Sequence, residues 1–210
     1  MSMKVCILNY GSGNVKSVYN IIKALTDDVI VSNDPDEIRN AEKLVLPGVG
    51  AYGTSMTKIK KTIPLDVVEG EVAIKKKPIL GICVGMQVLF TTGYEFGKHD
   101  GLGWIKGVVK LLDVEGLTLP HIGWNEIDVT KQNLLYAQNE KAGNDFYFVH
   151  SYACFPEDPD CVIATCDYGK EFCSAVQHEN IFGVQFHPEK SQIAGKKLLK
   201  NFIDLDYEKK

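Results

Sequence analysis

The chain has 210 residues, of which 45% are hydrophobic and 24% are charged, and its formal net charge is −4. Such a composition is typical of a globular protein with a substantial core, and its scattered lysines and arginines argue against nucleic-acid binding. No apolar run is long enough to cross a bilayer, and the first residues lack the pattern of a secretory signal peptide, so we expect a cytoplasmic protein without membrane contact.

The first 90 residues alternate between strand-like apolar runs and helical patterns. Strands are predicted at Lys4–Asn9, Val29–Ser32, Lys43–Leu46 and Ile79–Ile82. Helical spacing of apolar residues predicts helices over Val15–Leu25, around Met56 and Ile59, and from Pro64 to Ile74. Strands that alternate with helices are typical of a parallel sheet covered on both faces.

Beyond about residue 100 the pattern changes to turns and alternating β-branched residues, as in FYFVHSYACF and CVIATCDYG. This pattern predicts hairpins and mostly antiparallel strands, followed by an amphipathic helix over Ile193–Phe202. No linker, repeat or low-complexity segment interrupts the chain. We therefore predict one α/β domain over residues 1–210, with a mostly parallel central sheet and an antiparallel, strand-rich C-terminal half.

The segment PILGICVGMQVLF places Cys83 between two glycines, where a strand gives way to a predicted helix over Val84–Phe90. A G-x-C-x-G turn between strand and helix has the form of a nucleophile elbow, in which the glycines avoid crowding of neighbouring backbone. The alternative is a buried cysteine in a tight turn, since free cysteine is often buried. These residues alone leave both interpretations open.

Two glycine-rich loops could bind a ligand. The loop from Gly48 to Gly53 satisfies G-x-G-x-x-G, but it follows the third strand rather than the first, and the region about 20 residues on is helical, which argues against a dinucleotide site. Its backbone N–H groups could instead stabilise an oxyanion, or the loop could simply connect a strand to a helix. The turn Gly11–Asn14 is likewise either a plain turn or a ligand-facing loop.

Four cysteines lie late in the chain, at positions 154, 161, 166 and 173. Their spacings lack the C-x-x-C pairs of zinc sites, and a chain without a signal peptide is expected to keep reduced thiols. We expect no metal site.

A nucleophilic cysteine needs a base and a group that orients the base. His187 ends a predicted strand in FGVQFHPE, and the rigid turn at Pro188 could place Glu189 beside its ring. The alternatives are a surface strand end at His187, or His150 as the base. We expect His99, in a polar turn, to be solvated.

The segments GICVGMQ and FGVQFHPEKS resemble the class I, triad-type glutamine amidotransferases. With NYGSGN, LPGVGAYG, LPHIGWN and FVHSY, in this order over essentially the whole chain, the sequence is similar to the glutaminase subunits of imidazole glycerol phosphate synthase. Val84 and Val88 stand where leucine is more usual, and both substitutions keep the helix apolar. The resemblance implies a flavodoxin-like fold.

The resemblance also implies the residue roles. Cys83 would attack the side-chain amide of L-glutamine, His187 would carry the proton, and Glu189 would orient the imidazole. The oxyanion would be held by backbone N–H groups of Val84, Val49 and Gly50. The substrate would contact Gln87, Glu95, His150, Ser151 and Tyr152.

The partner implied by the resemblance is a (β/α)8-barrel cyclase subunit, which would form a heterodimer with this chain and use its ammonia to make imidazole glycerol phosphate in histidine biosynthesis. We expect Asn14, Trp124, Tyr147 and Lys190 to face that partner, although Trp124 could be a core residue. No cofactor is expected. The alternatives are the same glutaminase serving a surface-glycan enzyme, or a catalytically silent binding module, against which the intact triad argues.

Overall fold

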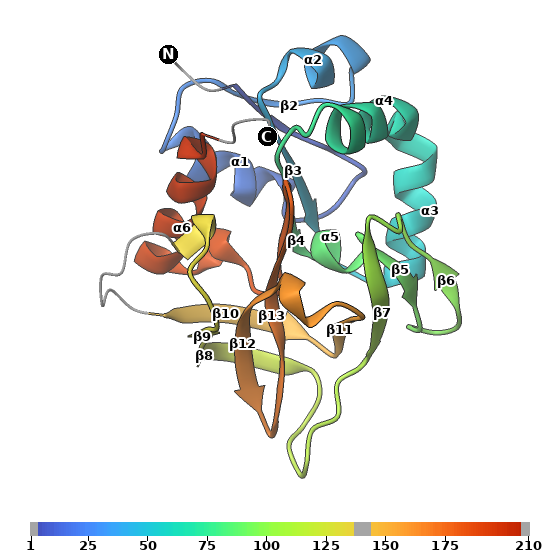
Figure 1. Ribbon diagram of the computed structural model, residues 1–210, viewed down its shortest axis with the longest axis vertical. Helices are drawn as coiled ribbons and strands as arrows, with labels where there is room; N and C mark the ends of the chain where they lie inside the picture. The colour runs from blue at the N-terminus through green and yellow to red at the C-terminus, as the bar shows by residue number, and fades with distance from the viewer. Residues whose placement is uncertain (1–3, 137–143, 207–210) are drawn as a thin grey trace.

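A twelve-stranded sheet runs through the computed structural model, which describes residues 4–136 and 144–206 (Figure 1). Its strands follow the order β2-β1-β3-β4-β14-β13-β11-β7-β5-β6, and off this path β12 pairs with β13 and β9 pairs with β12. These strands are β1 (Val5–Ile7), β2 (Val29–Val31), β3 (Lys43–Gly48), β4 (Ile79–Cys83), β5 (Phe90–Gly93), β6 (His99–Asp100), β7 (Ile105–Leu111), β9 (Asp128–Val129), β11 (Tyr152–Pro156), β12 (Val162–Tyr168), β13 (Lys170–His178) and β14 (Ile181–Val184). A separate antiparallel pair is formed by β8 (His121–Glu126) and β10 (Asp145–His150).

The first part of the sheet is parallel. Strands β2, β1, β3, β4 and β14 all run in one direction. Every residue of β1, β3, β4 and β14 is buried, as expected for strands covered on both faces. Because the carboxyl ends of parallel strands lie at one edge of a sheet, the residues that follow β3, β4 and β14 are brought together there.

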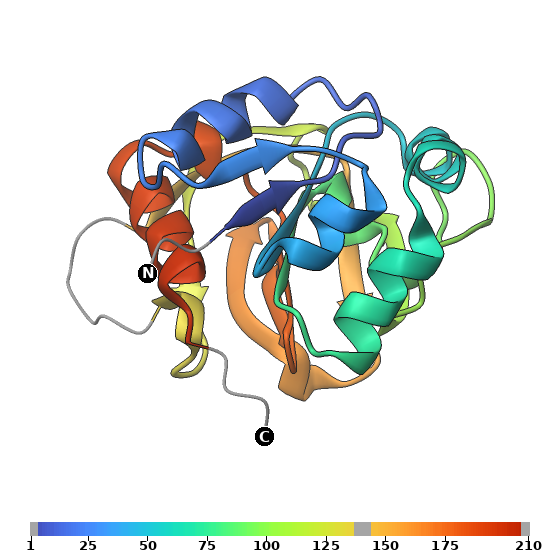
Figure 2. The ribbon, with the colours of Figure 1, turned by 90° about the horizontal axis from the view of Figure 1, so that it is seen from above.

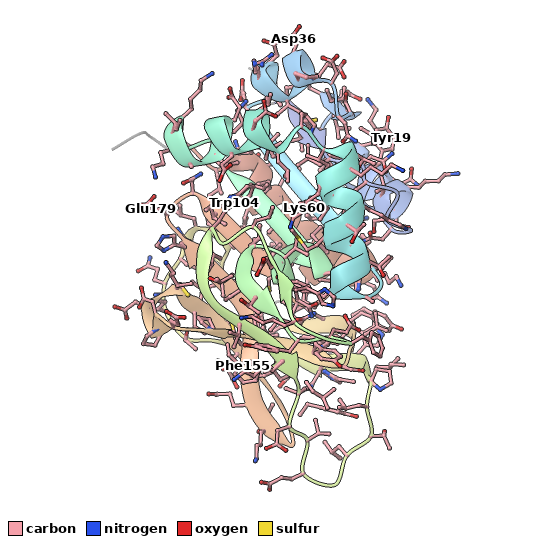
Figure 3. The ribbon with its side chains drawn as sticks, turned by 90° about the vertical axis from the view of Figure 1, so that its right-hand side faces the viewer. Tyr19, Asp36, Lys60, Trp104, Phe155 and Glu179 are labelled. Carbon is pink, nitrogen blue, oxygen red and sulfur yellow. The ribbon has the colours of Figure 1, made fainter. Side chains whose placement is uncertain are left out.

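Helices cover both faces of this parallel part, as predicted. In Figure 2, α1 and α6 lie on one side of the strands, and α2, α3 and α4 lie on the other. Figure 3 shows Asp36 and Lys60 on the outer surface of this second layer. The helices are α1 (Val15–Lys23), α2 (Pro35–Asn40), α3 (Tyr52–Thr62), α4 (Leu65–Glu69) with the π-helical η1 (Gly70–Ile74), α5 (Val84–Gln87) and α6 (Gln192–Asp204), with 3₁₀ turns η2 (Leu134–Tyr136), η3 (Pro159–Cys161) and η4 (Pro188–Lys190).

The C-terminal half is rich in antiparallel strands, which confirms the predicted change of pattern. Strand β13 pairs in antiparallel fashion with β14, β11 and β12, and β11 pairs in the same way with β7. These strands and the β8–β10 pair form the lower half of the molecule in Figure 1. The α/β fold class predicted from the sequence is therefore correct.

Two local predictions were wrong. The helix that starts at Val84 ends at Gln87, and Phe90 begins strand β5 because its side chain is fully buried in the sheet. His99 was expected in a solvated turn, but it lies in strand β6 and is half-buried.

The turn from β4 into α5 brings three backbone segments into contact at glycines. A Cβ on Gly85 would lie 1.9 Å from the carbonyl oxygen of Leu46 on β3. A Cβ on Gly81 would lie 2.5 Å from the carbonyl oxygen of Gly85, and one on Gly48 would lie 2.5 Å from the Gly85 nitrogen. Glycine is required here because of close approach between backbones.

Substitution of two glycines tests this packing. Gly85→Ala should lower the free energy of unfolding by about 3 kcal/mol or more, because the carbonyl of Leu46 belongs to a central strand and cannot move aside. Gly70→Ala is the control, since a Cβ at Gly70 meets nothing within 4 Å and the residue has helical dihedrals. It should stabilise the protein by roughly 0.5 to 1 kcal/mol. Urea denaturation of both variants gives the comparison, and a Gly85→Ala variant of wild-type stability would contradict it.

Candidate functional site

Cys83 is the last residue of β4, and its backbone is strained. Its φ is 55° and its ψ is −114°, a region that residues with a side chain rarely adopt. Strain of this kind persists where the surrounding structure enforces it, often at functional sites. Here Gly48 of β3 pairs with Cys83 on one side, and α5 begins at the next residue. The sulfur is thus held at the carboxyl edge of the parallel strands.

His187 and Glu189 reach the same edge from the end of β14. The Nδ1 of His187 lies 2.7 Å from Oε1 of Glu189, and both side chains are fully buried. Because a carboxylate only accepts hydrogen bonds, Nδ1 carries the proton, and the Nε2 lone pair is left for another partner. The 3₁₀ turn that starts at Pro188 folds the two side chains onto one side of the backbone.

The electrostatics of His187 point to Cys83. Burial alone would lower the pKa of His187, but the nearby Cys83 sulfur, followed by the Glu189 carboxylate, raises the pKa of the imidazole above its ordinary value. Among the described residues, no hydrogen-bond partner occupies the buried Nε2. A thiol beside an imidazole that is oriented by a carboxylate is the arrangement that activates a nucleophile.

A second chain of hydrogen bonds joins the triad to the loop after β3. The backbone N–H of Val49 donates to Oγ of Ser12 over 3.0 Å, and that hydroxyl donates to Oδ1 of Asn14 over 2.8 Å. The Nδ2 of Asn14 donates to Oε1 of Glu189 over 3.1 Å. Asn14 is buried in this role. In this structure the N–H of Val49 is therefore engaged by Ser12, and Gly50 follows with a φ of +107°.

Gln87 and Gln185 lie behind the cysteine, both almost fully buried. The Nε2 of Gln87 donates to the carbonyl of Tyr152 over 2.9 Å and to Oε1 of Gln185 over 3.0 Å. The Nε2 of Gln185 lies 3.7 Å from the Cys83 sulfur. Gln87 thus points into the protein rather than toward solvent.

The remaining pocket candidates come from two regions. The half-buried Glu95 accepts the first backbone N–H of α3, with Oε2 2.6 Å from the nitrogen of Tyr52. His150 and Tyr152 flank the break between β10 and β11, and Ser151 between them is half-buried. These residues therefore have structural partners of their own.

Both ring nitrogens of His150 are engaged, which decides between the two candidate bases. Its Nδ1 lies 2.9 Å from the carbonyl oxygen of Tyr152 and therefore carries the proton. Its Nε2 then accepts from Nδ1 of His121, 3.2 Å away. Burial lowers the pKa of His150 to about 3 and that of His121 to about 4. Both rings are neutral near pH 7, so His187 is the candidate base.

Trp124 is exposed on β8, so the alternative of a core residue is wrong. Its ring packs edge-on against Tyr147 on β10, with 6.1 Å between centroids, and Nζ of Lys190 lies 5.3 Å from the centroid of the Tyr147 ring. The three residues form one surface cluster. The backbone carbonyl of Tyr147 also accepts the N–H of His187 over 2.9 Å, so this cluster lies one hydrogen bond from the triad.

The late cysteines form no metal centre in the part of the chain that the structure describes, where no group of three or more candidate ligands is found. All six cysteines are buried free thiols. Burial raises the pKa of Cys161 to about 11 and that of Cys166 to about 12, so these thiols stay protonated. Over the same described ranges, no helix combines the length and apolar character needed to cross a bilayer.

Sequence reasoning missed Ser12 and Gln185. Both lie inside segments that were recognised, NYGSGN and FGVQFHPE. A serine in a turn and a glutamine two residues before a histidine carry no distinctive signal. Their hydrogen bonds connect residues far apart in the chain, so only the fold reveals them.

Comparison with known proteins places this geometry in a family. The family model described as "Glutamine amidotransferase class-I" matches residues 6–205. Relatives called "Imidazole glycerol phosphate synthase subunit HisH 2" in Vibrio vulnificus and "Imidazole glycerol phosphate synthase subunit HisH" in Aquifex aeolicus are 45% and 44% identical to this chain. The alignments cover 96% and 95% of this chain, and 94% and 96% of the relatives.

Solved structures share the fold at lower identity. The structure of PurLQS from Thermotoga maritima aligns with a TM-score of 0.73 at 21% identity, over 96% of this chain and 98% of that chain. A putative GMP synthase protein from Thermoplasma acidophilum aligns with a TM-score of 0.68 at 21% identity, over 97% and 93% of the two chains. At this identity the likeness extends to the fold alone.

The buried His121–His150 pair predicts a pH-dependent stability. Unfolded histidines take up protons near pH 6.5, whereas the folded pair stays neutral down to about pH 4 for His121 and about pH 3 for His150. The unfolded state therefore binds more protons below pH 6.5, and the stability that the pair contributes is lost as the pH falls.

His121→Phe tests this dependence, because the ring of His121 stacks on Phe148 and Tyr168 and phenylalanine can fill its place. Between pH 7 and pH 5 the variant should lose about 2 kcal/mol less of its free energy of unfolding than the wild type does. Urea denaturation at the two pH values measures the difference. Equal losses would contradict the assignment of a neutral buried pair.

Proposed function

The chain belongs to the class I glutamine amidotransferase family, and we propose that it is the glutaminase subunit of an imidazole glycerol phosphate synthase, hydrolysing L-glutamine to glutamate and ammonia. The observation that carries this proposal is the buried contact of His187 Nδ1 with Glu189, at the edge of the parallel strands where Cys83 ends β4.

The first half of the reaction uses the triad. The Nε2 of His187 takes the thiol proton, and the Cys83 thiolate attacks the side-chain carbonyl carbon of glutamine. The tetrahedral intermediate expels ammonia, which leaves with the proton from His187, and a glutamyl thioester remains. Water, deprotonated by the same imidazole, then attacks the thioester. The C–S bond breaks, glutamate is released, and the Cys83 thiolate takes the proton back from His187. Glu189 keeps the proton of His187 on Nδ1 and balances the positive charge of the imidazolium.

The oxyanion of both tetrahedral intermediates requires backbone donors. Val84, at the start of α5, supplies an N–H directly after the nucleophile. The second donor comes from the loop after β3, from Val49 or Gly50. Pro47 has no N–H to offer. Since Ser12 engages the N–H of Val49 in the isolated chain, the productive state requires that peptide to turn toward Cys83.

The pocket for the amino-acid end of glutamine is assembled from Gln87, Glu95 and the His150–Tyr152 segment. Glu95 supplies the negative charge for the α-ammonium. Because the amide nitrogen of Gln87 makes two hydrogen bonds within the protein, its contact with the substrate uses Oε1. His150 is neutral and faces His121, so it contributes shape to the pocket rather than charge.

The ammonia passes to a partner, a (β/α)8-barrel cyclase subunit that makes imidazole glycerol phosphate in histidine biosynthesis. Exposed Trp124 and Lys190, with the half-buried Tyr147 between them, form its contact surface on this chain. Asn14 is buried and donates to Glu189, so it does not belong to this surface. The names of the relatives favour this acceptor over a surface-glycan enzyme. The proposed chemistry uses no cofactor.

Removal of the nucleophile tests the mechanism. Cys83→Ala should abolish glutamine-dependent synthesis by the complex, while synthesis from added ammonia persists, because the partner's own site is untouched. Cys166→Ser, on β12, is the matched control and should keep most of the activity. Both rates are measured on the reconstituted complex. Glutamine turnover by Cys83→Ala at the wild-type rate would rule the mechanism out.

The position of Val49 predicts that the isolated chain is a poor glutaminase. Steady-state activity should rise by at least about two orders of magnitude when partner and its nucleotide ligand are both present, the amount that one oxyanion donor supplies. Ser12→Ala should raise the rate of the isolated chain by up to about tenfold, because it removes one hydrogen bond from the resting state. An equal kcat for the chain alone, with partner, and with partner plus ligand would exclude this switch.

A further inference from the structure

We propose that Gln185 is a further catalytic residue, whose side-chain amide donates a hydrogen bond to the sulfur of Cys83 and stabilises its thiolate. Its use in turnover rests on the proposed glutaminase function, whereas the hydrogen bond itself does not. The Nε2 of Gln185 lies 3.7 Å from the Cys83 sulfur, within the range of an N–H···S hydrogen bond. Gln185 thus touches the reacting atom directly.

The position of Gln185 is fixed by its backbone. It follows β14 directly and precedes His187 by two residues, and its N–H donates to the carbonyl of Ser174 on β13 over 2.8 Å. Its side chain is fully buried, and that of Cys83 is nearly so. Water therefore cannot easily take the place of this donor, and a buried anion without donors is costly.

The orientation of the amide follows from its neighbours. The carbonyl of Tyr152 can only accept, so the group of Gln87 that faces it is the nitrogen. The same nitrogen has a second hydrogen, which goes to Gln185. Gln185 must present its oxygen to Gln87 and therefore its NH₂ group to the sulfur. The opposite orientation would place two NH₂ groups face to face and an oxygen against the thiolate.

A hydrogen bond from this amide has two effects on the thiolate. It favours the ionised form, and it lowers the intrinsic nucleophilicity of that form, with a Brønsted coefficient of about 0.4 to 0.5. Suppose that loss of the donor lowers the fraction of ionised thiol about tenfold at acid pH. Each thiolate that remains is then about threefold more nucleophilic, which offsets roughly half of the loss on a logarithmic scale. The net loss of reactivity is then about threefold at acid pH, and it reverses to a gain of up to about threefold once both thiols are ionised.

Alkylation of Cys83 by iodoacetamide measures this without glutamine. Gln185→Met keeps the size of the side chain and removes the donor. Between pH 5.5 and 9.5, the second-order rate constant of the full-length variant should be about threefold lower than that of wild type at the acid end, and equal or higher at the alkaline end.

Two further variants serve as controls. Cys83→Ser gives the background rate of alkylation at the five other cysteines. Ser174→Ala is the matched control, since it removes a buried hydroxyl that has no hydrogen-bond partner among the described residues, and it should reproduce the wild-type profile.

The outcomes separate the two proposals. A Gln185→Met profile that coincides with wild type, or that is lower by one factor at every pH, overturns the role of Gln185, whatever the glutaminase activity is. A changed profile in a protein that hydrolyses no glutamine with its partner supports the hydrogen bond and contradicts the proposed function. If Gln185→Met does not fold, the NMR resonance of the Gln185 side-chain amide tests the hydrogen bond in the wild-type chain. It should move on titration of Cys83 and stay fixed in Cys83→Ala, and a resonance that is fixed in both overturns the proposal.

Discussion

The parallel pairing of β4 with β3 on one side and β14 on the other is the constraint on which the site depends. Cys83 ends β4, the loop with Val49 and Gly50 follows β3, and Gln185, His187 and Glu189 follow β14. No pair of these segments is adjacent in sequence, and the sheet alone brings them to one edge. The glycines at 81 and 85 let the backbone of α5 approach the strands closely enough for Cys83 to turn inward.

The pKa values of neighbouring histidines shift in opposite directions at this site. Burial acts on all three rings, but His187 also faces the Cys83 sulfur and the Glu189 carboxylate, and its pKa is raised. His121 and His150 face each other and a backbone carbonyl, and their pKa values fall. The protein thus keeps two neutral rings beside the one that must carry a proton. Environment, rather than residue type, assigns the base.

Much of the fold could be predicted from the sequence, because local patterns determine it. The continuous apolar runs of β1, β3 and β4 and the helical spacing of α1 and α6 each identify their element. Helix α2 was missed because Ile38 is its only buried residue. Its signal was the cap, since Asp34 accepts from the backbone N–H groups of Asp36 and Glu37. The helix over Val84–Phe90 was predicted too long because burial in the sheet outweighs helical spacing at Phe90.

The site could be predicted only in part. The short spacing of His187 and Glu189 around Pro188 predicts their contact. The choice between His187 and His150 could not be made from the residues, because it depends on which ring nitrogens are already engaged by distant groups. Ser12 and Gln185 were missed for the same reason. Hydrogen bonds between residues 37 to 102 positions apart have no local pattern.

The place of β14 in the sheet also bears on how the chain is made. This strand fills the gap between β4 and β13, yet it is synthesised after every other strand that the structure describes. Until it emerges from the ribosome, β4 has an unpaired edge made of buried, apolar residues, a surface prone to pairing with other chains. The nascent chain therefore carries an exposed, aggregation-prone edge from the time β4 forms until β14 pairs with it. The same step that covers this edge delivers His187 to Cys83, so a partly made chain has no working thiol.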